Sequence, residues 1–219
     1  MIVTIDGPAG SGKSSTAKKV AAELGWLYLD SGALYRTYTL LYLMGGQDAK
    51  LLIQHLDAHK ITIHTDGRDT EPLLNGERVG DEIRTSAVSD NVSTVAALPE
   101  VRDKVNEEMR RIVKKHHFIA DGRDLGSVVF PDAALKFFML ADLDERARRR
   151  EKELKEKNMP ADLDVIKKNL SERDKQDSAR KIAPLIKPDD AIEIDTTGLD
   201  FSEQVQQICD KIRSGLNIS

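Results

Sequence analysis

Short apolar segments alternate along this chain with longer segments whose apolar residues recur every three or four positions. Residues 1–6 are apolar and β-branched and stop at Gly7-Pro8, which predicts a short buried strand. From Lys13 to Leu24 the apolar residues follow helical spacing, and Gly25 supplies a stop. Further strands are predicted over residues 26–29, 118–120, 135–140 and 191–194.

Helices are predicted between most of these strands. Asp30-Ser31 can cap a helix that continues to about Met44, and Pro99 suits the first turn of another that runs to Ile112. A third helix is expected over about residues 142–158, and the last follows the capping-box pattern Asp200…Glu203. Strands that alternate with helices imply a parallel sheet covered on both faces, so the predicted class is α/β.

Residues 60–80 have a different pattern. Ile61-Thr62-Ile63-His64 alternates between apolar and polar positions, and both Asp66-Gly67 and Asn75-Gly76 are dipeptides typical of hairpin turns. This segment therefore predicts a small antiparallel β insertion.

The composition fits one globular unit. The 219 residues are 40% apolar and 32% charged, which is enough to bury a core in one substantial domain. No apolar run approaches the roughly 18 residues of a membrane span, and the N-terminus shows no basic segment or cleavage pattern. The single cysteine, Cys209, cannot form an internal disulfide, so a cytoplasmic location is expected. The net charge of −4 makes neither nucleic acid nor a membrane an expected partner.

A phosphate-binding loop joins the first strand to the first helix. The pattern G-x-x-x-x-G-K-[ST] is complete in this chain. Its backbone N–H groups can cradle phosphates at the helix N-terminus, Lys13 can reach the β- and γ-phosphates of ATP, and the Ser14 hydroxyl can ligate Mg²⁺. A turn that binds nothing is the alternative, which the flanking strand and helix disfavour. The residues expected to bind the nucleotide are Gly7, Pro8, Ala9, Gly10, Ser11, Gly12, Lys13, Ser14 and Ser15.

Such a loop does not by itself separate a kinase from a GTPase. Asp195-Thr196-Thr197-Gly198 formally fits the D-x-x-G switch of a GTPase, but it lies near the C-terminus, and nothing resembles the base-reading N-K-x-D motif. A kinase is therefore favoured over a GTPase.

The tetrapeptide Asp-Gly-Arg-Asp occurs twice, at residues 66–69 and 121–124. A hairpin turn is sufficient explanation for the first copy. The second follows the apolar strand 118–120, so it lies at the carboxyl end of a core strand, where parallel sheets bind their ligands. There Asp121 can hold Mg²⁺, and Arg123 and Asp124 would face the acceptor. A surface turn is the alternative for this copy.

Two helical segments carry further arginines that could hold phosphates. Arg173, Asp177 and Arg180 are spaced to share one helix face before Pro184 halts the helix, although an exposed ion pair is the simpler interpretation. Arg146, Arg149 and Arg150 also share a face. They could form a mobile flap that brings cations to the transferring phosphoryl group and excludes water, or they could simply be solvated.

Several blocks together resemble the bacterial cytidylate kinase family of P-loop nucleoside monophosphate kinases, and the similarity covers nearly the whole chain. The blocks lie in residues 4–14, 29–36, 93–102, 120–133 and 172–185. The second Asp-Gly-Arg-Asp block and the last block are the specific ones, because P-loops occur in many families.

The resemblance implies an adenylate-kinase-like core with a central parallel sheet, a short lid and an enlarged acceptor-binding insertion. It implies a single kinase unit over residues 1–219. Within this unit the core would comprise 1–30, 94–141 and 178–219, the acceptor-binding region 31–93, and the lid with its following helix 142–177.

The resemblance also implies roles for matched positions. The residues expected to bind the acceptor are, for its phosphate, Arg36, Arg123 and Arg180; for its cytosine ring, Ser93, Arg102 and Asp124; and for seating the nucleotide and its sugar, Ser31, Arg173 and Asp177. A cytosine edge, with an amino donor beside ring acceptors, suits a carboxylate with an arginine or a hydroxyl.

The expected reaction is in-line transfer of the γ-phosphoryl group of ATP to the 5′-phosphate of CMP or dCMP, with Mg²⁺, in pyrimidine nucleotide metabolism. The acceptor oxygen is already anionic, so alignment and charge stabilisation would suffice without a general base. The residues expected to act in catalysis are Lys13, Arg123, Arg146, Arg149 and Arg150. Ser14 and Asp121 are the expected metal ligands, and a monomer is expected.

Three alternatives stay open. An adenylate or uridylate kinase would differ only in the base that it accepts. A shikimate-type kinase would not explain the long segment from 50 to 93. A nucleotide-binding regulatory protein with a degenerate site is disfavoured by the intact Gly12-Lys13-Ser14 and Asp121.

Overall fold

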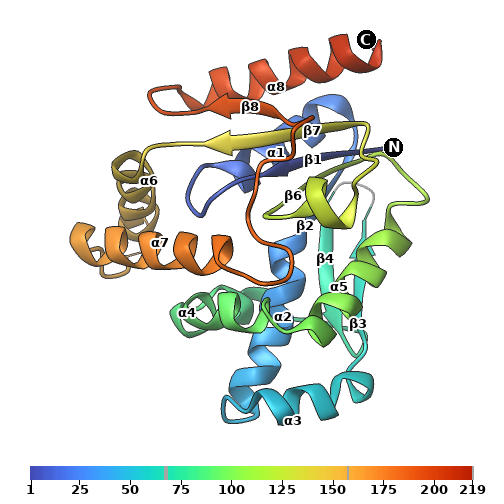
Figure 1. Cartoon of the computed structure of the whole chain (residues 1–219), viewed down its shortest axis with the longest axis vertical. Coiled ribbons are helices and arrows are strands. Elements are labelled where there is room, and N and C mark those ends of the chain that lie inside the picture. The colour runs from blue at the N-terminus through green and yellow to red at the C-terminus, as the bar shows by residue number, and fades with distance from the viewer. Residues whose placement is uncertain (67–68, 157, 219) are drawn as a thin grey trace.

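Five parallel strands form the central sheet, in the spatial order β2-β6-β1-β7-β8. The computed structural model describes residues 1–66, 69–156 and 158–218. The five strands are β1 (Ile2–Asp6), β2 (Leu27–Asp30), β6 (Phe118–Gly122), β7 (Leu135–Leu140) and β8 (Ile192–Asp195). All five had been predicted from the sequence, and their parallel pairing confirms the α/β class (Figure 1).

The alternation of side chains along each strand produces the two apolar layers of the core. Val3, Ile5 and Ile119 pack against α1 (Lys13–Leu24) and α8 (Phe201–Leu216) on one face of the sheet. Their neighbours Phe118 and Ala120 point to the opposite face. There they pack against a larger cluster formed by α2 (Ser31–Met44), α4 (Ser86–Val95) and α5 (Pro99–Ile112). In Figure 1, α8 accordingly lies on one side of the sheet and α2, α4 and α5 on the other.

The predicted helix boundaries are confirmed where a capping residue marks them. Asp30 Oδ1 accepts the backbone N–H of Ala33 at 2.9 Å and begins α2. Gly25 adopts the left-handed conformation that ends α1. The capping box of Asp200 and Glu203 is complete at the start of α8. Because these caps satisfy backbone groups that the helices cannot, they fix where each helix meets the sheet.

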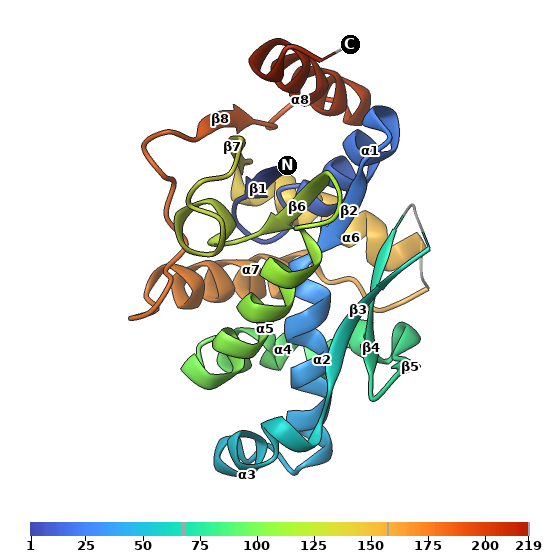
Figure 2. The same ribbon diagram turned by 90° about the vertical axis from the view of Figure 1, so that its right-hand side faces the viewer.

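The predicted β insertion is a three-stranded antiparallel sheet of β3 (Ile61–Thr65), β4 (Thr70–Leu74) and β5 (Glu77–Arg78). Asn75 and Gly76 both have positive φ angles, of 54° and 90°, as the predicted hairpin turn requires. Gly67 of the predicted Asp66-Gly67 turn, and with it Gly67-Arg68 of the first Asp-Gly-Arg-Asp, lies outside the described residues. We call β3, β4, β5 and the following short helix η2 (Gly80–Arg84) the arm; its strands lie beside α2 (Figure 2).

Among the described residues, five short or polar helical segments were not predicted: α3 (Ala49–Gln54), η1 (Leu56–Ala58), η2, α4 and η3 (Leu125–Val129). In the segment predicted as the lid and its following helix, α6 spans Leu143–Glu156 and α7 spans Leu163–Ser178. The expectation that one helix carries Arg173, Asp177 and Arg180 is wrong for Arg180. The chain folds back after α7, where the Leu185 N–H donates to the Asp177 carbonyl at 2.9 Å, and Arg180 lies in that turn. Within the described ranges, no helix is both long and apolar enough to cross a bilayer.

Candidate active site

The loop between β1 and α1 is shaped by glycines. Gly7 has a φ of 149°, and a Cβ there would lie 2.1 Å from the Met139 carbonyl oxygen, so no side chain fits. Gly10 and Gly12 also adopt positive φ angles, of 77° and 88°. The loop can therefore wrap its backbone around a small anion directly before the N-terminus of α1. Lys13 and Ser14, which follow the last glycine of the loop, are side chains suited to a phosphate.

Lys13 is folded back into this loop. Its Nζ donates to the Pro8 carbonyl at 2.6 Å and to Ser11 Oγ at 3.4 Å. Burial, and then the positive charge of Arg123, lower the pKa of Lys13 well below its ordinary value. An anionic phosphate in the loop would supply the negative charge that this buried ammonium group needs.

Ser14 and Asp121 face each other at the carboxyl end of the sheet. Ser14 Oγ donates to Asp121 Oδ2 at 2.7 Å, and the Tyr28 hydroxyl donates to Asp121 Oδ1 at 2.7 Å. Burial raises the pKa of Asp121, and the carboxylate of Asp30, its partner in the register of β2 and β6, raises it further. Two carboxylates beside a serine hydroxyl form an oxygen-rich site that a hard cation such as Mg²⁺ fits.

A cavity of about 150 Å³ lies next to this pair, and we call it the inner cavity. Its walls include Ser31, Ser93, Asp124, Asp177 and Arg180. Ser31 Oγ donates to the Asp121 carbonyl at 2.6 Å. The structure brings these predicted residues together, although they come from four separate segments of the chain.

Arg102 supports the wall of the inner cavity from behind. Its guanidinium is paired with Asp124 and donates to the Ala96 carbonyl at 3.2 Å, and it lies 5.6 Å from the ring centre of Tyr35. Arg102 is 2% exposed and lies behind Asp124, outside the residues that line the cavity. Burial raises the pKa of Asp124, against the opposing effect of Arg102. Asp124 therefore presents a fixed acceptor edge to the cavity.

Asp177 connects three of the predicted residues. It accepts Arg123 Nε at 2.9 Å, Ser93 Oγ at 3.1 Å and the guanidinium of Arg180. Burial alone would raise the pKa of Asp177, but Arg123 and Arg180 hold it below its ordinary value. This carboxylate keeps two arginines in the cavity wall in a defined orientation.

Arg36 and Arg173 are less well neutralised. Arg36 Nη1 donates to the Ile83 carbonyl at 3.1 Å and to Ser89 Oγ at 3.0 Å, both of them neutral groups. Burial, and then the charge of Arg173, lower the pKa of Arg36 to about 10. Burial and Arg123 lower the pKa of Arg173 in the same way. The cluster has a surplus of buried positive charge, which anionic ligands would relieve.

A second cavity, of about 550 Å³, extends along the glycine loop, and we call it the loop cavity. Gly10, Gly12, Lys13 and Ser15 line it on one side, and Arg149 and Arg150 on the other. It shares five residues with the inner cavity: Ser14, Arg36, Arg84, Arg123 and Arg173. The two cavities therefore meet at a wall of four arginines.

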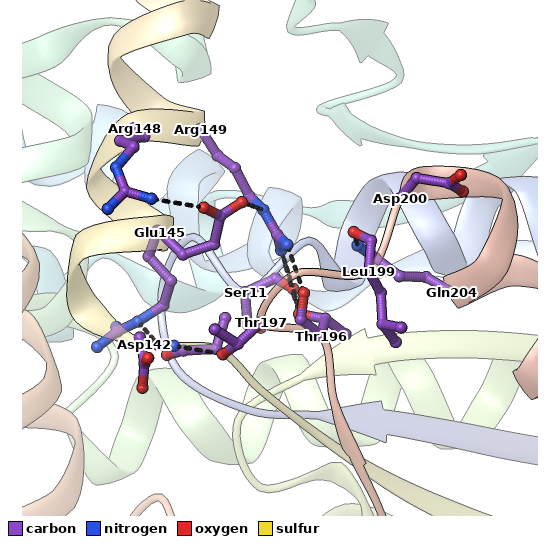
Figure 3. Close-up of polar contacts among 12 residues, drawn as sticks. Ser11, Asp142, Glu145, Arg148, Arg149, Thr196, Thr197, Leu199, Asp200 and Gln204 are labelled. Carbon is purple, nitrogen blue, oxygen red and sulfur yellow. Dashed lines mark hydrogen bonds and ion pairs between the residues drawn. The ribbon is translucent and has the colours of Figure 1, made fainter.

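Two arginines of α6 contact the loop between β1 and α1, as Figure 3 shows for Arg149. Its Nε donates to Glu145 at 2.9 Å, its Nη2 to the Thr196 carbonyl at 2.7 Å and its Nη1 to the Ser11 carbonyl at 3.4 Å. Arg146 is buried and donates to the Ala9 carbonyl and to Asp174. These two side chains therefore tie α6 to the backbone of the loop.

Arg150 is arranged differently from the other two. It pairs with Glu153 at 2.6 Å and lines the loop cavity. Of the three predicted flap arginines, Arg149 and Arg150 thus reach the cavity, while Arg146 lies beneath the loop.

Sequence reasoning missed several residues that build the site. Asp6 accepts the N–H groups of Leu125 and Gly126 at 3.0 and 2.7 Å, and its burial raises its pKa to about 6. Tyr28, Asp30 and Arg84 were also missed. Asp6 and Asp30 could have been found, because each is the last residue of an apolar strand at the ligand-binding edge of the sheet. No sequence signal marked Arg84, which comes from the arm.

The central parallel sheet and the glycine loop between β1 and α1 place this protein among the P-loop proteins. The cytidylate kinase family model matches residues 3–214. The chain is 44% identical over 212 residues to the cytidylate kinase of Lactococcus lactis subsp. cremoris (strain MG1363), with 96% of each chain covered. It is also 44% identical over 217 residues to that of Fervidobacterium nodosum (strain ATCC 35602 / DSM 5306 / Rt17-B1), covering 99% of this chain and 98% of that one. The chain belongs to the cytidylate kinase family.

The overall shape also has a counterpart among solved structures. An uncharacterized protein from Eubacterium ventriosum ATCC 27560 superimposes with a TM-score of 0.55 over 98% of each chain, at 15% identity. At that identity the likeness concerns the fold alone.

Proposed function

We propose that the protein transfers the γ-phosphoryl group of ATP to the 5′-phosphate of CMP and dCMP. The observation that carries the proposal is the meeting of the loop cavity and the inner cavity at Ser14 and four arginines. A donor nucleotide in the first cavity and an acceptor in the second would bring their phosphates together at this wall. Family membership agrees with this arrangement.

The donor side is built from the glycine loop. Its backbone N–H groups and Lys13 would bind the β- and γ-phosphates. Ser14 and Asp121 would hold Mg²⁺, which supplies charge neutralisation for the phosphates when bound. Arg149 and Arg150 would close the loop cavity from α6, while Arg146 keeps the loop backbone in place through the Ala9 carbonyl.

The acceptor side is the inner cavity. Asp124 would accept a hydrogen bond from the amino group of cytosine, with Arg102 holding the carboxylate, and Ser93 would contact the base from another wall of the cavity. Ser31, Arg173 and Asp177 would seat the sugar. Arg36, Arg123 and Arg180 would bind the phosphate, and Arg123 is placed to stay in contact during transfer because it lines both cavities.

Catalysis would come from alignment and charge stabilisation. The acceptor phosphate oxygen is anionic near neutral pH, so the site needs no general base. Lys13 and Arg123 would stabilise the charge that spreads over the transferring group. We further propose that residues 31–93 form the acceptor-binding region and 142–177 the lid with its following helix, and that the protein acts as a monomer in the cytoplasm.

A coupled assay that detects ADP formation tests the acceptor. CMP, dCMP, UMP, AMP and shikimate are compared at equal concentrations. CMP and dCMP should give the highest turnover. Faster turnover of AMP than of CMP would overturn the proposal, and nucleotide binding without ADP release would favour a regulatory protein instead.

A further inference from the structure

Arg84 stands where the cavities meet but comes from outside the core. It is the last residue of η2 and lines the inner cavity, the loop cavity and the space between the arm and α6. Of the other arginines in the shared wall, Arg36 comes from α2, Arg123 from the turn after β6 and Arg173 from α7. Arg84 is therefore the contribution of the arm to the place where two sets of phosphates would meet.

The backbone at Arg84 is anchored, whereas the side chain is not. The neighbouring Ile83 is 3% exposed and packs against Ala33 and Val79. The next residue, Thr85, caps α4. The Arg84 side chain itself is 51% exposed, compared with 21% for Arg123 and 7% for Arg180. The guanidinium can thus change partners by rotation of side-chain bonds, without movement of the backbone.

In this structure the partner of Arg84 is Asp30. Arg84 Nη2 lies 2.7 Å from Asp30 Oδ2, while the other carboxylate oxygen caps α2. Asp30 pairs in register with Asp121, so this ion pair lies directly beside the predicted metal site. An arginine held by one carboxylate at the rim of an anion site is prepared to accept a phosphate, since guanidinium binds phosphate and carboxylate with the same fork of donors.

We propose that Arg84 is a further phosphate-binding residue of the reaction, which contacts the acceptor's phosphate beside the transferring group, and that Asp30 positions it. This inference rests on the proposed function and deepens it. It assigns to the arm a charge-stabilising role in addition to forming one side of the acceptor site.

Binding of CMP and of cytidine, measured by calorimetry without ATP or metal, separates the phosphate from the rest of the ligand. Arg84→Ala should weaken CMP binding by about 10-fold or more and leave cytidine binding within about twofold, because only CMP carries the phosphate. Arg84→Lys should recover part of the loss, since it keeps the charge without the fork. The turnover of Arg84→Ala should fall by about 10- to 100-fold.

Arg78→Ala is the matched control. Arg78 lies on β5 of the same arm and pairs with Glu71 at 2.8 Å, and it lines neither the inner cavity nor the loop cavity. Its replacement should change CMP binding and turnover less than twofold. Thermal unfolding of both variants checks that the arm is folded.

Asp30→Asn tests the positioning role, because asparagine keeps the helix cap but loses the charge. It should weaken CMP binding less than Arg84→Ala does, and replacing both residues should add little to Arg84→Ala alone. Equal loss of CMP and cytidine binding in Arg84→Ala would show a purely structural residue and overturn the inference. Unchanged CMP binding would do the same. A wild-type protein that fails to phosphorylate CMP would refute the proposed function instead, while the binding comparison would still decide the role of Arg84.

Discussion

The hydroxyl of Ser14, at the start of α1, donates to the carboxylate of Asp121, at the end of β6, at 2.7 Å. The two residues are 107 positions apart in the chain and meet because β6 lies directly beside β1. Asp121→Asn should reduce turnover by about 10²-fold or more while the protein stays folded, because an amide cannot supply the charge that holds a divalent cation. Steady-state kinetics across a Mg²⁺ titration would measure this.

Removal of the metal with a chelator provides the companion test. Activity of the wild-type protein should be lost on addition of EDTA and restored by excess Mg²⁺. Full activity in EDTA would contradict a metal at Ser14 and Asp121. Asp132→Asn, an exposed change in the turn before β7 at the opposite edge of the sheet, is the control and should behave as wild type.

Lys13→Ala removes the buried ammonium group from the glycine loop. Turnover should fall by about 10²-fold or more, since Lys13 is placed to follow the charge of the transferring phosphoryl group. Lys18→Ala is the matched control, because Lys18 lies on the same helix but pairs with Asp69 on the surface. Near-normal activity of Lys13→Ala would count against the phosphotransfer mechanism.

Asp124→Asn breaks the buried pair with Arg102. We expect a loss of about 3–5 kcal/mol in the free energy of unfolding, because the guanidinium is left buried without a counter-charge. Denaturant unfolding measures the loss. The KM for CMP should rise and the preference for CMP over UMP should shrink in the fraction that is folded. An unaltered CMP preference would argue that other residues read the base.

Arg149→Ala should disturb the glycine loop between β1 and α1, although Arg149 itself lies in α6. Arg149 joins the carbonyls of Ser11 and Thr196, so its loss should raise the KM for ATP and lower turnover, together by about 10- to 100-fold in kcat/KM. Arg148→Ala is the neighbouring control. The Arg148 side chain is 64% exposed and pairs only at the surface of α6 with Glu145, so kcat/KM should stay within about twofold.

Asp6 should make stability depend on pH. Its pKa is about 6 in the folded protein, above the ordinary value of 3.8, mainly because it is buried. The folded state therefore holds this proton more tightly than the unfolded state, and the stability that the protonated group contributes is lost as pH rises from about 4 to about 6. The loss should amount to about 3 kcal/mol, because the pKa of Asp6 in the folded protein lies about 2 above its ordinary value.

The difference between wild type and Asp6→Asn isolates this group from the other carboxylates. Asparagine does not titrate, so the unfolding free energy of wild type relative to the variant should fall across that pH range. It should then level off above about pH 7, where the group is ionised in both states. A difference that is constant from pH 4 to pH 7 would show that Asp6 titrates normally.

The sequence was sufficient for the core because its signals are local. Gly25, Asp30 and the Asp200…Glu203 pair mark helix ends through contacts within a few residues, and the apolar strands identify themselves by composition. Helix α4 was missed because Ser86–Val95 is rich in serine and valine, which are poor helix formers, and it is stabilised by burial of Val88, Val92 and Val95.

In the candidate site, too, the parts formed by neighbouring residues could be predicted from the sequence, and the parts formed by distant segments could not. The glycine loop is contiguous, so its geometry could be expected from its residues alone. The pairing of Asp177 with Arg123 depends on how α7 packs beside α4 and α6, and the place of Arg84 depends on how the arm folds back over α2. Neither follows from spacing, because both join segments more than 50 residues apart.

The order of strands has a consequence for how the chain acquires its structure during synthesis. β1 and β2 are not neighbours, because β6 lies between them and pairs with both. At about 5–20 residues per second, the roughly 90 residues that separate β2 from β6 take several seconds or more to emerge from a ribosome. Until then β6 has not been made, so β1 and β2 lack the strand that pairs with both of them, and their apolar side chains stay exposed. Newly made chains should therefore depend on chaperones most strongly before residue 122 is free.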